Sequence, residues 1–126
     1  MTTTSSIRVL VVGSGHMGIS HARAYKKIEG FEICGVVTRS ISSSQAMIDE
    51  LGPFPQFTDF EKALEETRPD AVSISSYTET HHPFTMTALD AGCHVFVEKP
   101  LAESVDKARE IAQKAKASGR KVLVGY

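Results

Sequence analysis

A glycine-rich segment follows the first apolar run of the chain. Residues 9–12 read Val-Leu-Val-Val and lead directly into Gly13-Ser14-Gly15-His16-Met17-Gly18, after which a helical pattern begins. Strand, tight turn and helix in this order form the setting in which Gly-x-Gly-x-x-Gly binds the pyrophosphate of a dinucleotide at the helix N-terminus. Gly13 permits the turn, Gly15 leaves the backbone open to phosphate, and Gly18 lets the helix pack against the strand. The candidate cofactor-binding residues here are Gly13, Gly15, His16, Met17 and Gly18, and the alternative is a glycine turn without a ligand.

The end of the second expected strand bears on which dinucleotide fits. In NAD-specific sites an Asp or Glu about 20 residues after the glycines hydrogen-bonds the ribose 2′-hydroxyl. Thr38, Arg39 and Ser40 occupy this region, so that carboxylate is missing. Arg39 could pair with a 2′-phosphate through two N–H groups, and the hydroxyls of Thr38 and Ser40 could donate further hydrogen bonds. The sequence therefore predicts a preference for NADP over NAD; the alternative is an exposed Arg39 that leaves both cofactors acceptable.

Polar residues also follow the fourth and fifth expected strands. Residues 75–83 read Ser-Ser-Tyr-Thr-Glu-Thr-His-His-Pro, and Glu98-Lys99-Pro100 follows the apolar run 95–97. Open parallel sheets bind ligands in a crevice at the carboxyl ends of their strands. We therefore expect both segments beside the nicotinamide half of a dinucleotide, with Lys99 held extended by Pro100, whose peptide bond can be cis. The alternatives are a polar loop that caps a helix and an ordinary exposed ion pair between Glu98 and Lys99.

Strand and helix patterns alternate along the whole chain. Strands are predicted over residues 7–12, 31–38, 55–57, 71–76, 94–98 and 121–125. Helices are predicted over residues 16–28, 42–51, 58–67, from His81 or His82 to Gly92, and 104–119, with capping boxes at Ser42-Gln45 and Thr58-Glu61. The inward residues of the last helix are expected to be Val105, Ala108, Ile111 and Ala115. This alternation predicts a doubly wound α/β fold around a parallel six-stranded sheet in the order 3-2-1-4-5-6, with right-handed crossovers.

Composition narrows the classes of function. The 126 residues, with 41% hydrophobic residues and a net charge of -1, suit one globular domain and offer no basic surplus for nucleic acid. No apolar run approaches the roughly 18 residues that span a bilayer, and residues 1–6 form a polar tail without signal-peptide features. We expect a cytoplasmic protein with one dinucleotide-binding domain over residues 7–126. Cys34 and Cys93 are expected to be reduced core residues, and no Cys/His spacing fits a metal site.

These motifs resemble those of the Gfo/Idh/MocA family, which includes glucose–fructose oxidoreductase and inositol dehydrogenase. The resemblance rests on residues 13–18, 76–81, 88–92, 98–100 and 122–126. It implies an NAD(P)-dependent oxidoreductase that acts on a sugar, cyclitol or related hydroxyl compound. The further cofactor-lining residues that it implies are Ser76, Tyr77, Thr78, His81, Glu98, Lys99 and Pro100. Tyr77 departs from the proline usual in its loop, although a tyrosine could still stack near the cofactor.

The resemblance also implies a reaction. Hydride would pass between a nicotinamide and a carbon bearing a hydroxyl, and Lys99 would stabilise the developing alkoxide or help to pass its proton. Family members carry a second α/β domain that supplies most substrate contacts and most of the assembly interface. We therefore expect this chain to bind cofactor with little turnover, and the full protein to be a homo-oligomer. A non-enzymatic NAD(P)-binding regulator is the alternative function, and a nucleotide-free structural domain is the third.

Overall fold

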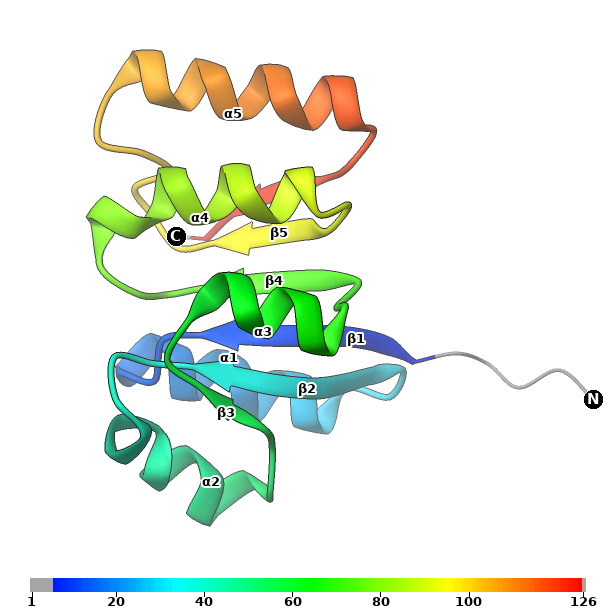
Figure 1. The fold of residues 1–126 in the computed structure, drawn as a ribbon, viewed down its shortest axis with the longest axis vertical. Helices are drawn as coiled ribbons and strands as arrows, with labels where there is room; N and C mark the ends of the chain where they lie inside the picture. The colour runs from blue at the N-terminus through cyan, green and yellow to red at the C-terminus, as the bar shows by residue number, and fades with distance from the viewer. Residues whose placement is uncertain (1–5, 126) are drawn as a thin grey trace, which may run out of the picture.

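The strands form one parallel sheet with helices on both of its faces (Figure 1). The computed structural model describes residues 6–125, so residues 1–5 of the expected polar tail and Tyr126 lie outside the described residues. The strands are β1 (Ile7–Val12), β2 (Phe31–Val37), β3 (Gln56–Phe57), β4 (Ala71–Ile74), β5 (His94–Val97) and β6 (Val122–Val124). The helices are α1 (His16–Lys27), the 3-10 helix η1 (Ile41–Ser44), α2 (Gln45–Leu51), α3 (Phe60–Thr67), α4 (Thr78–Asp90) and α5 (Val105–Ser118).

The sheet order confirms the predicted doubly wound topology. The strands lie in the order β3-β2-β1-β4-β5-β6, and every neighbouring pair is parallel. Val12 at the end of β1 is in register with Val37 of β2 and Ile74 of β4, and Ile74 is in register with Val97 of β5. The carboxyl ends of these four strands therefore lie at the same level, which we call the carboxyl edge of the sheet, and the loops that follow them lie side by side.

Two apolar cores lie on opposite faces of the sheet. On one face, Leu10 and Ile74 pack among side chains of α3, α4 and α5, the three helices in front of the sheet in Figure 1. On the other face, Val9 packs with Ala22 of α1 and Met47 of α2. Successive residues of a strand point to opposite faces, so the unbroken apolar run of β1 supplies both cores. This double coverage explains why the strand shows no polar alternation.

Both cysteines belong to the packed interior. Cys34 and Cys93 are buried and free. Burial raises the pKa of the Cys93 thiol to about 11 and also raises the pKa of the Cys34 thiol. Both thiols are therefore protonated at neutral pH and behave as small apolar residues, and the expected place of both cysteines in the core is confirmed.

Residues 6–125 contain no helix whose length and apolar character would allow it to cross a membrane. Within the same residues, no group of three or more His, Cys, Asp and Glu side chains is placed to bind a metal ion.

Two predicted capping boxes are wrong. Asp59, and not Thr58, caps α3, because its carboxylate accepts a hydrogen bond from the Lys62 N–H at 3.2 Å. Ser42 lies within η1, and no side-chain hydrogen bond caps the start of α2 at Gln45. At α3 a neighbouring polar residue caps the helix instead of Thr58, and at α2 the preceding residues already form a 3-10 helix and supply no side-chain cap.

Two expectations about the later helices are also wrong. Helix α4 begins at Thr78 rather than at His81 or His82, so Pro83 lies inside the helix. Tertiary packing of α4 against the sheet outweighs the one backbone hydrogen bond that an internal proline removes. Val105, the first residue of α5, is 68% exposed, while Ile111 is buried as expected. At 3.6 residues per turn, six residues rotate through about 600°, so the Val105 side chain points about 120° away from that of Ile111 and lies off the buried face of α5.

Replacing a core side chain of β1 tests this architecture. Leu10 is 0% exposed, and Leu10→Ala is expected to lower the free energy of unfolding by about 3 to 5 kcal/mol because it leaves a cavity in a packed core. The matched control is Leu123→Ala on β6, where the side chain is 64% exposed and the expected change stays within about 0.5 kcal/mol. Urea unfolding followed by circular dichroism measures both. Equal losses in the two variants would contradict the described core.

Candidate functional site

The glycine turn joins β1 to α1 through a very close contact. Gly13 has φ +100°, a left-handed conformation that glycine adopts without strain. A Cβ atom on Gly18 would lie 2.2 Å from the carbonyl oxygen of Gly13, so only glycine allows the helix to start this near the strand. A Cβ atom on Gly15 would meet nothing within 4 Å, so the space beside its backbone is open. The three glycines thus occupy the three structural settings that the motif predicts.

The N-terminus of α1 is free of competing groups. Gly15 is its N-cap, no side chain caps the helix, and its first turn contains no acidic residue. The unpaired N–H groups and the positive end of the helix dipole are therefore suited to bind an anion. The side chains of His16 and Met17 are exposed, so these two residues can contribute through their backbone N–H groups.

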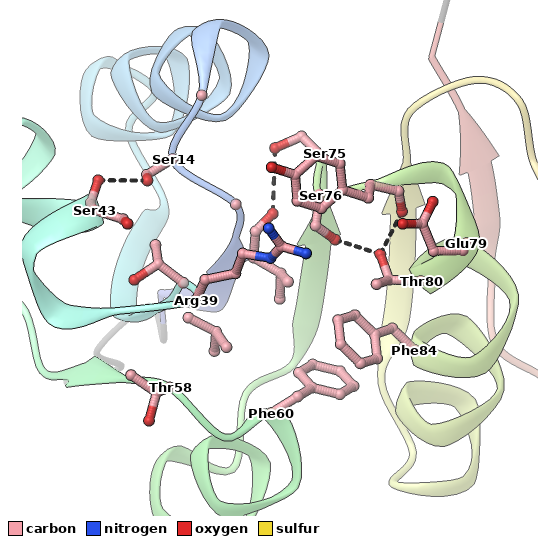
Figure 2. A pocket seen from close by; sticks show the side chains of 16 residues that line it. Ser14, Arg39, Ser43, Thr58, Phe60, Ser75, Ser76, Glu79, Thr80 and Phe84 are labelled. Carbon is pink, nitrogen blue, oxygen red and sulfur yellow. Dashed lines mark hydrogen bonds between the residues drawn. The ribbon is translucent and has the colours of Figure 1, made fainter.

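A cleft of about 540 Å³ opens beside this turn, at the carboxyl edge of the sheet (Figure 2). One wall is the glycine turn, the second is the end of β2, and the third is the β4–α4 segment. Phe60 of α3 and Phe84 of α4 line its apolar part, with ring centroids 4.5 Å apart. The lining residues are Val12, Gly13, Ser14, Gly15, Val37, Thr38, Arg39, Ser43, Thr58, Phe60, Ser75, Ser76, Tyr77, Glu79, Thr80 and Phe84. A cleft with apolar surface and a few polar groups fits a nucleotide-sized ligand.

The β2 wall carries Thr38 and Arg39 but no carboxylate. Thr38 is buried, and its hydroxyl donates a hydrogen bond to the carbonyl oxygen of Ser40 at 2.6 Å. Ser40 is not among the lining residues; its hydroxyl lies 2.8 Å from the hydroxyl of Ser43, which does line the cleft. Arg39 is exposed and extends across the cleft toward the β4–α4 segment (Figure 2). Thr38 and Ser40 thus have hydrogen-bond partners for their hydroxyls, whereas Arg39 is the most accessible of the three predicted residues.

The β4–α4 wall combines fixed hydroxyls with one exposed ring. The hydroxyl of Ser75 donates to the carbonyl oxygen of Val12 at 3.2 Å, and the hydroxyls of Ser76 and Thr80 lie 2.6 Å apart (Figure 2). Tyr77, the N-cap of α4, is 56% exposed. Thr78 was expected in the cleft, but it is the first residue of α4 and is not among the lining residues, whereas Thr80 of the same helical turn is.

His81 does not reach the cleft. Its ring is buried at 2% exposure, with Nε2 lying 2.9 Å from the carbonyl oxygen of Ser76 and Nδ1 lying 2.7 Å from that of Pro100. The imidazole therefore ties the β4–α4 segment to the loop after β5. His81 was expected to line the cofactor cleft, but it is not among the lining residues.

Glu98, Lys99 and Pro100 lie at the end of β5, one strand beyond the cleft. Glu98 is buried, and its Oε1 lies 2.6 Å from Nε2 of His21 on α1. Lys99 and Pro100 are exposed, and the peptide bond between them is cis. The Lys99 side chain is thus accessible at the sheet edge, whereas the Glu98 carboxylate is held against α1 rather than paired with Lys99.

Several lining residues escaped the sequence analysis. Ser14 donates a hydrogen bond to the Ser43 carbonyl oxygen at 2.7 Å, a contact between segments 29 residues apart. Phe60 and Phe84 reach the cleft only because α3 and α4 pack together on the sheet. No local pattern marks Phe60 or Phe84 as ligand-facing. Ser14 could have been included, because it lies between the first two glycines of the motif.

Residues 7–126 match the sequence model of the Gfo/Idh/MocA oxidoreductases, described as an oxidoreductase family with an NAD-binding Rossmann fold. The chain belongs to this family. The glycine turn and the cleft described above lie within the matched residues, so the match and the geometry point to the same site. The resemblance inferred from the sequence motifs is confirmed.

Relatives in sequence are dehydrogenases. D-glucoside 3-dehydrogenase of Escherichia coli K12 is 34% identical over 119 residues, which are 94% of this chain and 34% of that protein. Inositol 2-dehydrogenase of Agrobacterium fabrum is 31% identical over 124 residues, which are 96% of this chain and 37% of that protein. The chain thus spans little more than a third of the length of these relatives.

A solved structure repeats the fold. Scyllo-inositol dehydrogenase from Lactobacillus casei, with bound NAD(H) and scyllo-inositol, superposes with a TM-score of 0.89 at 28% identity. The superposition covers 96% of this chain and 36% of that chain. The shared part therefore comprises essentially the whole of the domain described above.

Two glycine substitutions should separate the structural from the ligand-facing role of the turn. Gly18→Ala would place a methyl group against the Gly13 carbonyl and is expected to cost about 3 kcal/mol or more of stability. Gly15→Ala meets open space and should cost at most about 1 kcal/mol, through a poorer N-cap, while lowering the affinity for NADH and NADPH. Thermal unfolding and fluorescence titration measure the two effects. Unchanged affinity in Gly15→Ala would exclude phosphate binding beside that backbone.

Proposed function

We propose that this chain is the cofactor domain of a dehydrogenase that transfers hydride between a nicotinamide and a hydroxyl-bearing carbon. The open space beside Gly15, at the uncapped N-terminus of α1, is the observation that carries the proposal. A diphosphate placed there would receive backbone N–H groups and the positive end of the helix. The adenosine half would then lie in the cleft along the β2 wall, and the nicotinamide half would extend toward the end of β5.

Lys99 is the proposed catalytic residue. Its side chain is exposed at the end of β5, next to the expected nicotinamide position, and it is free of the buried Glu98–His21 contact. An ammonium group there would stabilise the negative charge that develops on a substrate oxygen. The cofactor supplies the redox chemistry, and the domain's residues bind and orient it.

The proposed substrate is a sugar, a cyclitol or a related polyol. This class is supported by the names of the relatives, which include a D-glucoside 3-dehydrogenase and several inositol 2-dehydrogenases. We also place the protein in the cytoplasm, which fits two free thiols. Assembly into a homo-oligomer, through regions beyond this domain, is part of the same proposal.

NADP is the proposed preferred cofactor. No carboxylate lies on the β2 wall of the cleft, where NAD-specific sites place one for the ribose hydroxyls. Arg39 occupies that wall, and among residues 6–125 no carboxylate lies within ion-pair distance of its guanidinium. A 2′-phosphate would meet this unpaired cation without having to displace an acidic partner.

Titration of the chain with NADPH and NADH at matched salt tests both the cofactor site and its preference. Wild-type protein is expected to bind NADPH more tightly. Arg39→Asp should weaken NADPH binding by about tenfold or more while leaving NADH affinity within about twofold, because only the 2′-phosphate uses the guanidinium. Arg109→Asp, an exposed change on α5, is the matched control. Equal losses for the two cofactors would contradict the role of Arg39, and binding of neither by wild type would contradict the cofactor site.

Lys99→Met tests the catalytic proposal in a form of the protein that turns over a polyol. Turnover is expected to fall by at least about tenfold, with cofactor affinity within about twofold, because the ammonium would act on the developing alkoxide rather than on the bound dinucleotide. Lys116→Met, an exposed lysine near the end of α5, is the control. Steady-state rates together with cofactor titration separate the two effects, and unchanged turnover would remove Lys99 from the mechanism.

A further inference from the structure

Arg39 and Tyr77 meet across the cleft. Arg39 follows β2, whereas Tyr77 is the N-cap of α4, so the two residues belong to opposite walls. The guanidinium carbon of Arg39 lies 4.4 Å from the centroid of the Tyr77 ring, which is the distance of a cation–π stack. Figure 2 shows Arg39 extending from its own wall toward the β4–α4 segment. This contact fixes where an otherwise exposed and flexible cation lies.

The backbone of Tyr77 is well held, although its ring is exposed. The carbonyl oxygen of Tyr77 accepts hydrogen bonds from the N–H of Thr80 at 2.9 Å and from the hydroxyl of Thr80 at 2.6 Å. The Thr80 hydroxyl also lies 2.6 Å from that of Ser76. The ring therefore projects from an anchored turn, and at 56% exposure it contributes little to the core. A large ring at this place serves the cleft rather than the fold.

The stack leaves the guanidinium able to bind an anion. A cation–π contact uses the face of the guanidinium, whereas its five N–H donors lie in the plane of the group and point to its edges. Among the described residues Arg39 forms no ion pair or hydrogen bond, so those donors have no protein partner there. The N–H groups at the edge of the guanidinium can therefore donate two parallel hydrogen bonds to a phosphate while its face stays stacked on the Tyr77 ring.

We infer that Tyr77 is a positioning residue for cofactor specificity, because it holds Arg39 where a 2′-phosphate would bind. The inference rests on the proposed preference for NADP. Ordering a long side chain before the ligand arrives lowers the entropy cost of binding. Tyr77 thereby favours a 2′-phosphorylated ligand over its unphosphorylated counterpart without itself touching the phosphate.

Two nucleotide fragments isolate this effect from the rest of the cofactor. Adenosine 2′,5′-bisphosphate and adenosine 5′-monophosphate differ only in the 2′-phosphate, so the ratio of their affinities reports on that group alone. Tyr77→Leu is expected to lower the ratio by about two- to fivefold, in keeping with an exposed cation–π contact. Tyr77→Phe keeps the ring face and should retain the wild-type ratio. Calorimetric titration of the chain provides the affinities.

A double-mutant cycle shows whether Tyr77 acts through Arg39. In an Arg39→Gln background, Tyr77→Leu should leave the ratio unchanged, because the cation that the ring holds is absent. A loss that persists in that background would overturn the inference. So would an equal loss for both fragments in Tyr77→Leu alone, since that result means that the ring contacts the base or the 5′-phosphate.

Proton NMR of the ligand-free chain supplies an independent test of the stack. The side-chain methylene protons of Arg39 should be shifted upfield by the Tyr77 ring, with the shift lost in Tyr77→Leu and kept in Tyr77→Phe. The absence of this shift in wild type would overturn the inference. Failure of the proposed function has a different signature, namely that wild type binds neither fragment. Equal binding of the two fragments by wild type would refute the NADP preference and this inference, but not nucleotide binding.

Discussion

The contact between Gly18 and Gly13 is the constraint on which the site depends. Because neither position has a side chain, the first turn of α1 packs directly on the carbonyl group of Gly13, the residue that follows β1. A Cβ on Gly18 would lie 2.2 Å from that carbonyl oxygen. The N-terminus of the helix therefore lies at the sheet edge rather than several ångströms beyond it. The ends of β2 and β4 arrive at the same edge because of the parallel register. One close approach thus brings a helix dipole and two strand ends around a single cleft.

The polar residues near this edge divide into two groups with different physical roles. Arg39, Tyr77 and Glu79 are exposed and face the cleft or its mouth. His81 and Glu98 are buried, and each is bonded to another part of the chain, as buried polar groups must be. The second group joins the loops after β4 and β5 to each other and to α1. Residues that occur together in family motifs can therefore hold the walls of a site instead of contacting its ligand.

Charge in the cleft is arranged locally and does not follow from the net charge of -1. The positive contributions are the N-terminus of α1 and the guanidinium of Arg39, which flank the place proposed for the phosphates. Glu79 is the single acid among the lining residues, and it lies on the α4 wall rather than on the β2 wall. A ligand with several phosphates is complementary to such a site.

The sequence by itself determined the order of elements, the sheet topology and the place of the glycine turn. The order of elements and the glycine turn follow from local signals, because apolar runs, helical periods and glycines act within a few residues of one another. The sheet order follows from the general rule for doubly wound folds, which the alternation of strands and helices indicates. It also placed Arg39 at the end of β2 and Lys99 at the end of β5. Only the tertiary structure decided that Phe60 and Phe84 line the cleft, that His81 joins two loops, and that Tyr77 meets Arg39. Each of these depends on the packing of segments far apart in the chain, for which the sequence carries no local signal.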